Sequence, residues 1–168
     1  EDSEVGRVSN VDRTAFHVGG NLAITPGAVV FENELIQLIQ YRPSTDKVYQ
    51  RPLVIVPPCI NKFYILDLQP ENSFVRHAVA RGHTVFMVSW RNVPPELAHL
   101  DWDDYLTLGV MRPIEVAREI CGVEQVNALG FCVGGTLLAA ALAALHAKNE
   151  RPVRSMTLLT TMLDYGDT

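Results

Sequence analysis

The chain has few cysteines, and their spacing excludes the sites that cysteines most often build. Three thiols, Cys59, Cys121 and Cys132, occur among 168 residues, with no Cys-x-x-Cys pair and no histidine nearby at zinc-ligand spacing. An odd number of scattered cysteines is typical of a protein kept in a reducing cytosol and not of a disulfide framework. We therefore expect a cytoplasmic protein with free thiols and no metal site.

The chain also lacks concentrated positive charge and any apolar segment of membrane-spanning length. Its net charge is −5 and it has no run of lysine or arginine, which argues against nucleic acid or an anionic membrane surface as the main partner. The apolar stretch Leu137–Ala147 is far shorter than the about 20 residues that a transmembrane helix needs, so we expect a buried helix. The first residues, Glu1–Glu4, are acidic and polar and do not resemble a signal peptide.

What the chain does contain is an alternation of short β-prone runs with helical patterns. Its length predicts one domain, residues 1–168, of which residues 1–14 are expected to be poorly ordered. Two runs separated by Glu32-Asn33-Glu34 predict an antiparallel hairpin, and the later strands alternate with helices, which indicates a mostly parallel sheet with helices on both faces. The expected strands are Ala28–Phe31, Leu35–Tyr41, Leu53–Val56, Thr84–Ser89, Val126–Leu129 and Met156–Thr160, and the expected helices are Ser73–Arg81, Asp101–Ile120 and Gly135–Ala147.

The stretch Gln125–Thr136 has the pattern around which the other elements are organised. It places Gly130 and Gly134 two residues before and two residues after Cys132, which is the nucleophile-elbow pattern G-x-S-x-G with cysteine in the serine position. A sharp strand-to-helix turn that lifts one side chain clear of a sheet needs flanking residues almost free of side chain. An antiparallel start followed by this elbow predicts an α/β-hydrolase core with Cys132 as the catalytic nucleophile.

Backbone amides at the elbow are expected to stabilise negative charge. The first amides of a helix lack intrahelical partners, and their partial positive charge favours a thiolate at Cys132 and an oxyanion beside it. In this fold one oxyanion donor is the amide of the residue after the nucleophile. That residue is Val133 here.

The second oxyanion donor is expected in the loop after an early strand, here Pro57–Lys62. The loop opens with two prolines, which have no N–H to donate. We therefore predict the amide of Ile60 as the donor, with Asn61 as the alternative. Cys59, in the same loop, is interpreted as a small residue that fills a tight turn and not as a second catalytic thiol.

Other residues that could carry chemistry have simpler interpretations. Cys121 is at a helix end, followed by a glycine, and is expected to be structural. Asp67 is expected to form a local hydrogen bond or cap a helix. The acidic cluster of Asp101, Asp103 and Asp104 stands at a helix start, where carboxylates cap unpaired amides, so we prefer capping to metal binding.

The chain lacks an evident general base for Cys132. In this fold an acid and then a histidine follow the nucleophile in chain order, but only His146, Asp164 and Asp167 follow it here. His146 lies near the far end of the helix that begins at the elbow, roughly 20 Å away at 1.5 Å per residue, and Asp164 has no later histidine to orient. We therefore expect that the catalytic domain continues beyond these residues, so that the C-terminal part of the core is missing, and that the chain alone is nearly inactive.

Five sequence blocks give the chain a specific resemblance. They are Val56–Pro70, Gly82–Asn92, Trp102–Tyr105, Leu129–Thr136 and Thr157–Asp164. With these blocks in this order, the chain resembles, over nearly its whole length, the N-terminal part of the catalytic region of a class I poly(3-hydroxyalkanoate) synthase, the polyhydroxybutyrate polymerase type.

The resemblance implies an activity, a substrate and partners. Cys132 matches the acylated cysteine that carries the growing polyester and attacks (R)-3-hydroxyacyl-CoA, with 3-hydroxybutyryl-CoA the expected monomer. Coenzyme A is then part of the substrate and a product, and no separate cofactor is implied. The implied partners are the polyester chain, the surface of a cytoplasmic polyester granule and a second copy in a homodimer. The family's base histidine and aspartate have no matching position in this chain.

Two alternatives share parts of this pattern. A cysteine-type α/β-hydrolase, such as a thioesterase or a dienelactone hydrolase, has the same elbow but uses water as the final acceptor. A non-catalytic module on a polyester granule needs no reactive thiol, so replacement of Cys132 by alanine would leave its behaviour unchanged.

Overall fold

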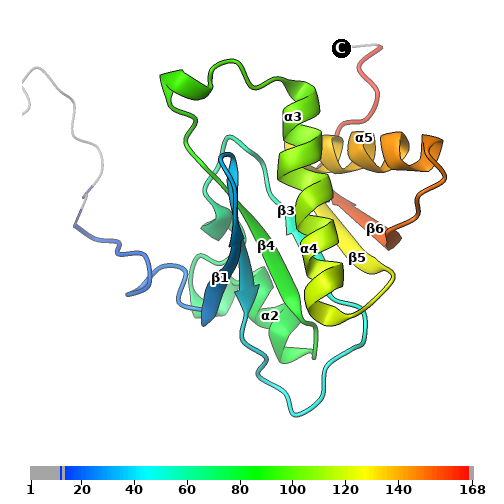
Figure 1. Ribbon diagram of the computed structural model, residues 1–168. Helices are drawn as coiled ribbons and strands as arrows, with labels where there is room; N and C mark the ends of the chain where they lie inside the picture. Colours follow the sequence, from blue (N-terminus) through cyan, green and yellow to red (C-terminus); the bar gives the residue numbers. More distant parts are fainter. Residues whose placement is uncertain (1–11, 13, 167–168) are drawn as a thin grey trace, which may run out of the picture.

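One mixed sheet, with the hairpin at one edge, organises the structure. The computed structural model describes residue 12 and residues 14–166, so the expectation of poor order in residues 1–14 lies almost wholly outside the described residues. Within that part of the chain the strand order is β1-β2-β4-β3-β5-β6 (Figure 1). The strands are β1 Gly27–Glu32, β2 Ile36–Tyr41, β3 Leu53–Val56, β4 Val85–Trp90, β5 Val126–Phe131 and β6 Val153–Leu159.

The hairpin joins the parallel strands through an antiparallel pairing. β1 pairs with β2 and β2 with β4 in antiparallel register, whereas β4, β3, β5 and β6 are parallel neighbours. Asn33 forms the hairpin turn, since its Oδ1 accepts hydrogen bonds from the amides of Leu35 and Ile36, each at 2.9 Å. Side-chain hydrogen bonds of this kind are why asparagine is favoured in turns. The predicted hairpin and the mostly parallel sheet are confirmed.

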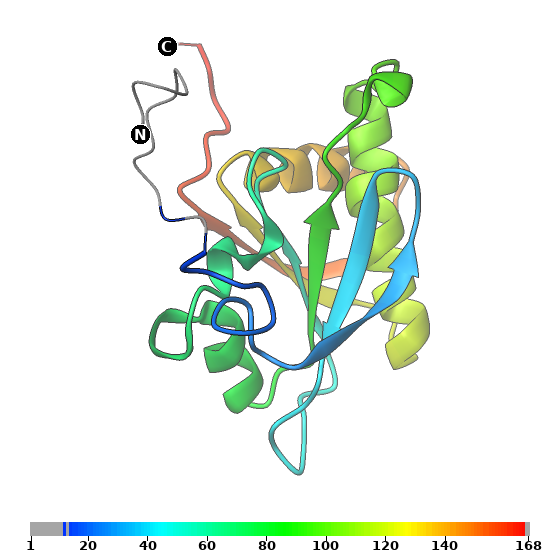
Figure 2. The same ribbon diagram turned by 90° about the vertical axis from the view of Figure 1, so that its left-hand side faces the viewer.

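Helices cover both faces of the sheet, as predicted. α2 lies on one face, and the α4 and α5 helices lie on the other (Figure 2). A π-helical segment, η4, joins α3 to α4 into one long helix. The helical elements are α2 Phe74–Ala80, α3 Trp102–Leu106, η4 Thr107–Met111, α4 Arg112–Cys121 and α5 Val133–Ala147, with short 3₁₀ turns η1 Phe63–Leu66, η2 Pro70–Asn72 and η3 Pro95–Leu97.

The central strands are buried on both faces because helices pack on each side. Along β4, Phe86 and Val88 belong to the core on the α4–α5 side, whereas Val85 and Met87 belong to the core on the α2 side. This alternation follows the two-residue period of a strand. The sheet therefore holds a core on each face, and its edge at the carboxyl ends of β3, β4 and β5 carries the loops of interest.

The helix starts agree with the predicted capping chemistry. Asp101 accepts hydrogen bonds from the amides of Asp103 at 3.0 Å and Asp104 at 3.3 Å, and Asp104 accepts one from the amide of Asp101 at 2.9 Å. This is a reciprocal capping box. It accounts for the acidic cluster, and no group of metal-ligating side chains is found among the described residues.

Several predicted details are corrected by tertiary packing. The spacing in α2 predicts that Phe74, Ala78 and Val79 face inward, but the helix buries Val75, Ala78 and Val79, with Phe74 half-buried against the same core. β6 begins at Val153, three residues before its predicted start, because it pairs with β5 from Val126 onward. α5 begins at Val133 and not at Gly135, since the elbow itself is its first turn.

The expectation that α5 is a buried helix is only partly correct. Its buried side chains, which include Leu137, Ala141 and Leu145, lie along one face, while Ala143 on the opposite side is exposed. A helix that is apolar all round gives no signal of which face is covered. Among the described residues, none of the helices combines the length and apolar character needed to cross a membrane.

Candidate active site

Cys132 occupies the junction between β5 and α5 with an unusual backbone conformation. Its φ is 54° and its ψ is −127°, a region that non-glycine residues rarely adopt and that is typically kept at functional sites. The amide of Cys132 donates a hydrogen bond of 2.9 Å to the carbonyl oxygen of Leu159, at the end of β6. The sequence therefore forms the predicted elbow, and the neighbouring strand fixes its backbone.

Three glycines allow the elbow to pack. A Cβ atom on Gly130 would lie 2.4 Å from the Cα of Gly135, and a Cβ on Gly134 would lie 2.3 Å from the carbonyl oxygen of Val56. Both predicted elbow glycines are thus required by contact with backbone. Gly135 is a third glycine that the packing requires, since a Cβ on it would lie 2.0 Å from the Oγ1 of Thr161. The prediction from the sequence missed this residue. The only signal for it in the sequence is the doubled glycine.

The first turn of α5 presents amides beside Cys132. Val133 is the first residue of the helix, so its N–H has no intrahelical acceptor. The carbonyl oxygen of Cys132 accepts hydrogen bonds from the amides of Gly135 at 2.9 Å and Thr136 at 3.3 Å. The amide of Val133 thus has no intrahelical acceptor, and its role as an oxyanion donor remains a prediction.

The loop 57–62 lies against the same helix turn. It follows β3, whose Val56 is the register partner of Gly130 on β5. The amide of Asn61 donates to the carbonyl oxygen of Pro58 at 3.1 Å and closes a turn, so it is not free for a substrate. No such acceptor is found for the amide of Ile60 among the described residues, and the Ile60 side chain is 81% exposed. The geometry favours Ile60 over the alternative Asn61.

Residues at the end of β4 hold both ends of this loop. The indole Nε1 of Trp90 donates a buried hydrogen bond of 2.8 Å to the carbonyl oxygen of Pro57. The Nζ of Lys62 donates to the Oδ1 of Asn92 at 2.9 Å. Trp90 was not identified from the sequence, because a tryptophan at the end of a buried strand has the pattern of an ordinary core residue.

The two other thiols have environments unlike that of an activated nucleophile. Burial raises the pKa of Cys59, a hydrogen bond with its own backbone lowers it, and electrostatic repulsion by Cys132 raises it further. Burial likewise raises the pKa of Cys121. Cys59 also packs against the core on the α4–α5 side. Both residues fit the structural roles expected for them.

The described histidines do not form a pair with a carboxylate. His146 lies in the last turn of α5, where its Nε2 is 3.2 Å from an Nη2 of Arg151. Asp164 accepts a hydrogen bond of 2.9 Å from the amide of Gly166 and so closes a local turn. The ring of His99 contacts the backbone carbonyl oxygen of Glu96 at 3.1 Å, and among the described residues no histidine ring shares a hydrogen bond or ion pair with a side-chain carboxylate. The expectation that the base for Cys132 lies outside this chain stays a prediction.

Asp67 forms contacts with residues far from it in the sequence, beyond the local contact predicted for it. Its Oδ1 accepts hydrogen bonds from the hydroxyl of Ser73 at 2.5 Å and from the hydroxyl of Thr25 at 2.6 Å, 42 positions earlier in the chain. Its carbonyl oxygen accepts from the amide of Ala23 at 3.0 Å. Asp67 therefore attaches the segment before β1 to the loop before α2, which corrects the purely local interpretation.

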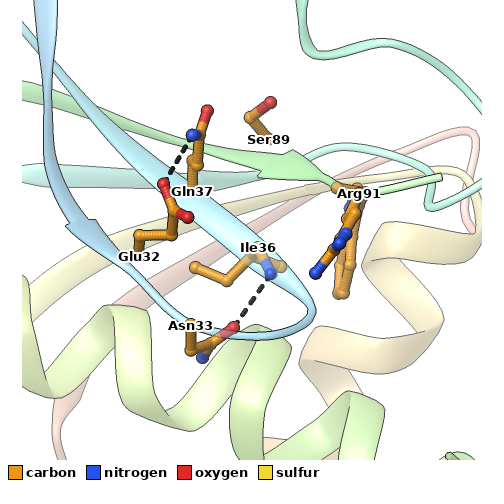
Figure 3. Close-up of a pocket in the computed structure, with 7 residues that line it drawn as sticks. Glu32, Asn33, Ile36, Gln37, Ser89 and Arg91 are labelled. Carbon is orange, nitrogen blue, oxygen red and sulfur yellow. Dashed lines mark hydrogen bonds between the residues drawn. The ribbon is translucent and has the colours of Figure 1, made fainter. Parts of the chain in front are cut away.

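A separate polar cavity of about 360 Å³ lies where the hairpin meets the end of β4 (Figure 3). Inside it, Gln37 donates a hydrogen bond of 2.6 Å to Glu32, and the amide of Ile36 donates to Asn33. Arg91 also contributes to its wall. β3 stands between β4 and β5 in the sheet, so this cavity is displaced from Cys132 by two strands. Trp90, which donates to the carbonyl of Pro57, lines the cavity, but the cavity is not assigned to the chemistry of Cys132.

A mostly parallel sheet with a nucleophile elbow after β5 defines the class of protein as an α/β-hydrolase fold. Residues 52–167 match the family model described as alpha/beta hydrolase fold. A solved structure from a study of two esterases of the fungus Rhizomucor miehei superposes with a TM-score of 0.57. It covers 98% of this chain and 58% of the esterase at 15% identity, which shows a shared fold and nothing finer.

The sequence comparisons identify the family within that class. Residues 1–78 match the model described as the N-terminus of poly-beta-hydroxybutyrate polymerase. The poly(3-hydroxyalkanoate) polymerase subunit PhaC of Cupriavidus necator is 60% identical over 168 residues, and that of Rhizobium meliloti is 46% identical over 159 residues. These alignments cover 100% and 95% of this chain but only 28% and 26% of the relatives. The chain belongs to the poly(3-hydroxyalkanoate) polymerase family.

Proposed function

We propose that the protein containing this chain is an acyltransferase that polymerises (R)-3-hydroxyacyl-CoA, in particular 3-hydroxybutyryl-CoA, through covalent catalysis by Cys132. The observation that carries this proposal is the placement of Cys132 at a glycine-packed elbow with a φ of 54°, a strained backbone conformation of the kind that clusters at active sites. The names of the similar polymerases support the substrate class. A class I enzyme, specific for short monomers, fits the loop sequence Pro57–Lys62.

In the loading step, the sulfur of Cys132 attacks the thioester carbonyl of the substrate. A bond forms between Sγ and the carbonyl carbon, the bond from that carbon to the sulfur of coenzyme A breaks, and the proton of the cysteine thiol passes to the leaving thiolate through a base. Exchange of one thioester for another is near balance in free energy. Cysteine can therefore accept and release the acyl group without forming a stable ester.

In the extension step, a 3-hydroxyl oxygen attacks the acyl group carried by Cys132, and the sulfur leaves with the proton that the hydroxyl loses. Each attack places negative charge on the carbonyl oxygen. The amides of Val133 and Ile60 are the proposed donors to this oxyanion, since fixed donors stabilise charge that develops in the transition state. Coenzyme A is the product of loading, and no further cofactor is required by these steps.

The remaining catalytic groups are proposed to lie outside this chain. A histidine and an aspartate are proposed there as the base and its orienting acid, because the described histidines have no carboxylate partner. We also propose that the whole protein acts as a homodimer at the surface of cytoplasmic polyester granules. The acidic chain, with no run of basic residues, is not proposed to bind nucleic acid.

The test uses the full polypeptide of which this chain is a part. Incubation with 3-hydroxybutyryl-CoA is expected to release coenzyme A and to form insoluble polyester, while peptide mass spectrometry after proteolysis shows an acyl adduct on the peptide that contains Cys132. Formation of free 3-hydroxybutyrate in place of polymer would assign the protein to the hydrolases. Unchanged behaviour after Cys132→Ala would instead indicate a non-catalytic granule module.

A further inference from the structure

Trp90 links β4 to the loop that carries a proposed oxyanion donor. It is the last residue of β4 and is only 6% exposed, and its indole N–H donates a hydrogen bond of 2.8 Å to the carbonyl oxygen of Pro57. The two residues are 33 positions apart in the chain. The contact is therefore a tertiary one, at the carboxyl edge of the sheet where Cys132 also lies.

The loop has few other means of holding its position. Pro57 and Pro58 have no N–H, so this part of the loop is fixed through its carbonyl oxygens. The carbonyl of Pro58 is used within the loop, where it accepts from the amide of Asn61. The carbonyl oxygen of Pro57 accepts its hydrogen bond from Trp90, outside the loop. It also packs against Gly134, where an added Cβ would lie 2.5 Å from it. One carbonyl group thus connects the loop, β4 and the first turn of α5.

The indole ring is itself held firmly. A Cβ on Gly109 would lie 2.3 Å from two atoms of the ring, so this glycine packs directly on Trp90. Tyr105 stacks on the ring with centroids 5.6 Å apart and an interplanar angle of 24°. Gly109 belongs to the π-helical segment η4, and single π-turns inside α-helices are frequent at functional sites. The π-helical turn places Gly109, which has no side chain, directly against the indole ring of Trp90.

We propose that Trp90 is a positioning residue for the oxyanion hole, an inference that rests on the proposed acyl transfer at Cys132. By holding the carbonyl of Pro57, Trp90 sets the distance between the amide of Ile60, three residues further on, and the amide of Val133 on α5. Trp90 does not contact the substrate. Trp90 lowers the activation free energy of acyl transfer only through the stabilisation of the oxyanion.

Two reactions of Cys132 separate this role from a general effect on folding. Acylation by a thioester develops an oxyanion, whereas alkylation by iodoacetamide displaces iodide at a saturated carbon and develops none. Trp90→Phe keeps an aromatic ring but loses the N–H donor. In the full polypeptide we expect kcat for thioester acylation to fall about tenfold, less than the ~10²–10³ that loss of a direct oxyanion donor costs. KM and the rate of Cys132 alkylation should stay the same.

A matched control and an isostere make the test decisive. Trp102→Phe replaces an exposed tryptophan, 48% accessible, at the start of α3, and should leave acylation unchanged. Replacement of Trp90 by β-(3-benzothienyl)alanine keeps the shape of the indole without its N–H, and should reproduce the effect of Trp90→Phe in a protein with unaltered packing.

The outcomes are distinct. Slower acylation with unchanged alkylation, in both Trp90 variants, supports the positioning role. Unchanged acylation in the isostere, or equal slowing of acylation and alkylation, overturns it. Absence of any Cys132 acylation in the unmodified polypeptide would instead refute the proposed function on which the inference rests.

Discussion

The carbonyl oxygen of Val56, at the end of β3, lies only 2.3 Å from the position that a Cβ atom on Gly134 would occupy. The first turn of α5 therefore packs directly on the backbone of a neighbouring strand. Backbone atoms at the end of a central strand cannot move aside as a flexible side chain can. The second elbow glycine is required by this contact as well as by the bend at Cys132.

Gly134→Ala is expected to destabilise the fold strongly. The added methyl group would overlap two carbonyl groups, those of Val56 and Pro57, and overpacking of this kind costs at least about 2 kcal/mol. Gly122→Ala is the matched control, because its φ is 61° but nothing lies within 4 Å of the added Cβ, so only a backbone cost of about 1 kcal/mol applies. Denaturant unfolding of both variants measures the difference, and equal losses would contradict the contact.

Cys132→Ala is expected to abolish covalent loading by a hydroxyacyl thioester. Cys59→Ser and Cys121→Ser should leave the adduct in place, since both thiols lie in structural environments with raised pKa values. Intact-mass spectrometry after exposure of the full polypeptide to 3-hydroxybutyryl-CoA gives the stoichiometry of loading. An adduct that persists in Cys132→Ala and disappears in Cys59→Ser would assign the nucleophile to the other loop.

The alkylation of Cys59 is expected to depend on Cys132. Because burial and electrostatic repulsion by Cys132 raise the pKa of Cys59, its reaction with iodoacetamide should need a pH above the ordinary thiol value of about 8.5. Removing the charge with Cys132→Ser should lower that pKa and move the pH midpoint of Cys59 alkylation downward. Peptide mass spectrometry across a pH series measures it. Cys121, whose pKa is raised by burial alone, is the internal control and should keep its midpoint.

Thr25→Val is expected to loosen the segment that precedes β1. The change removes the hydroxyl donor to Asp67 and keeps the size of the side chain, and loss of a hydrogen bond to a carboxylate costs about 1–2 kcal/mol. Hydrogen exchange at the amide of Ala23, which donates to the carbonyl of Asp67, should become faster. Thr14→Val is the control, because its hydroxyl donates to the exposed Asp12 only two residues away. Unchanged exchange at Ala23 would show that Thr25 does not hold this segment.

The sequence by itself determined the elements whose signals are local. The elbow pattern around Cys132, the hairpin turn at Asn33 and the capping acids at Asp101 and Asp104 each have a signal within a few residues of the chain, so spacing alone revealed them. Runs of buried β-branched residues likewise located the central strands, since burial on both faces requires an apolar residue at every position.

Only the tertiary structure decided which distant residues complete the site. The contacts of Trp90 with Pro57, of Gly135 with Thr161 and of Asp67 with Thr25 join separate segments, and no spacing within one segment records them. The same holds for α5, whose apolar residues surround the helix while only those on one face are fully buried. The nucleophile can be identified from the sequence because the strand-to-helix turn that carries it needs glycines at fixed positions. The groups that position its partners depend on how strands and helices pack, which is set by the whole fold.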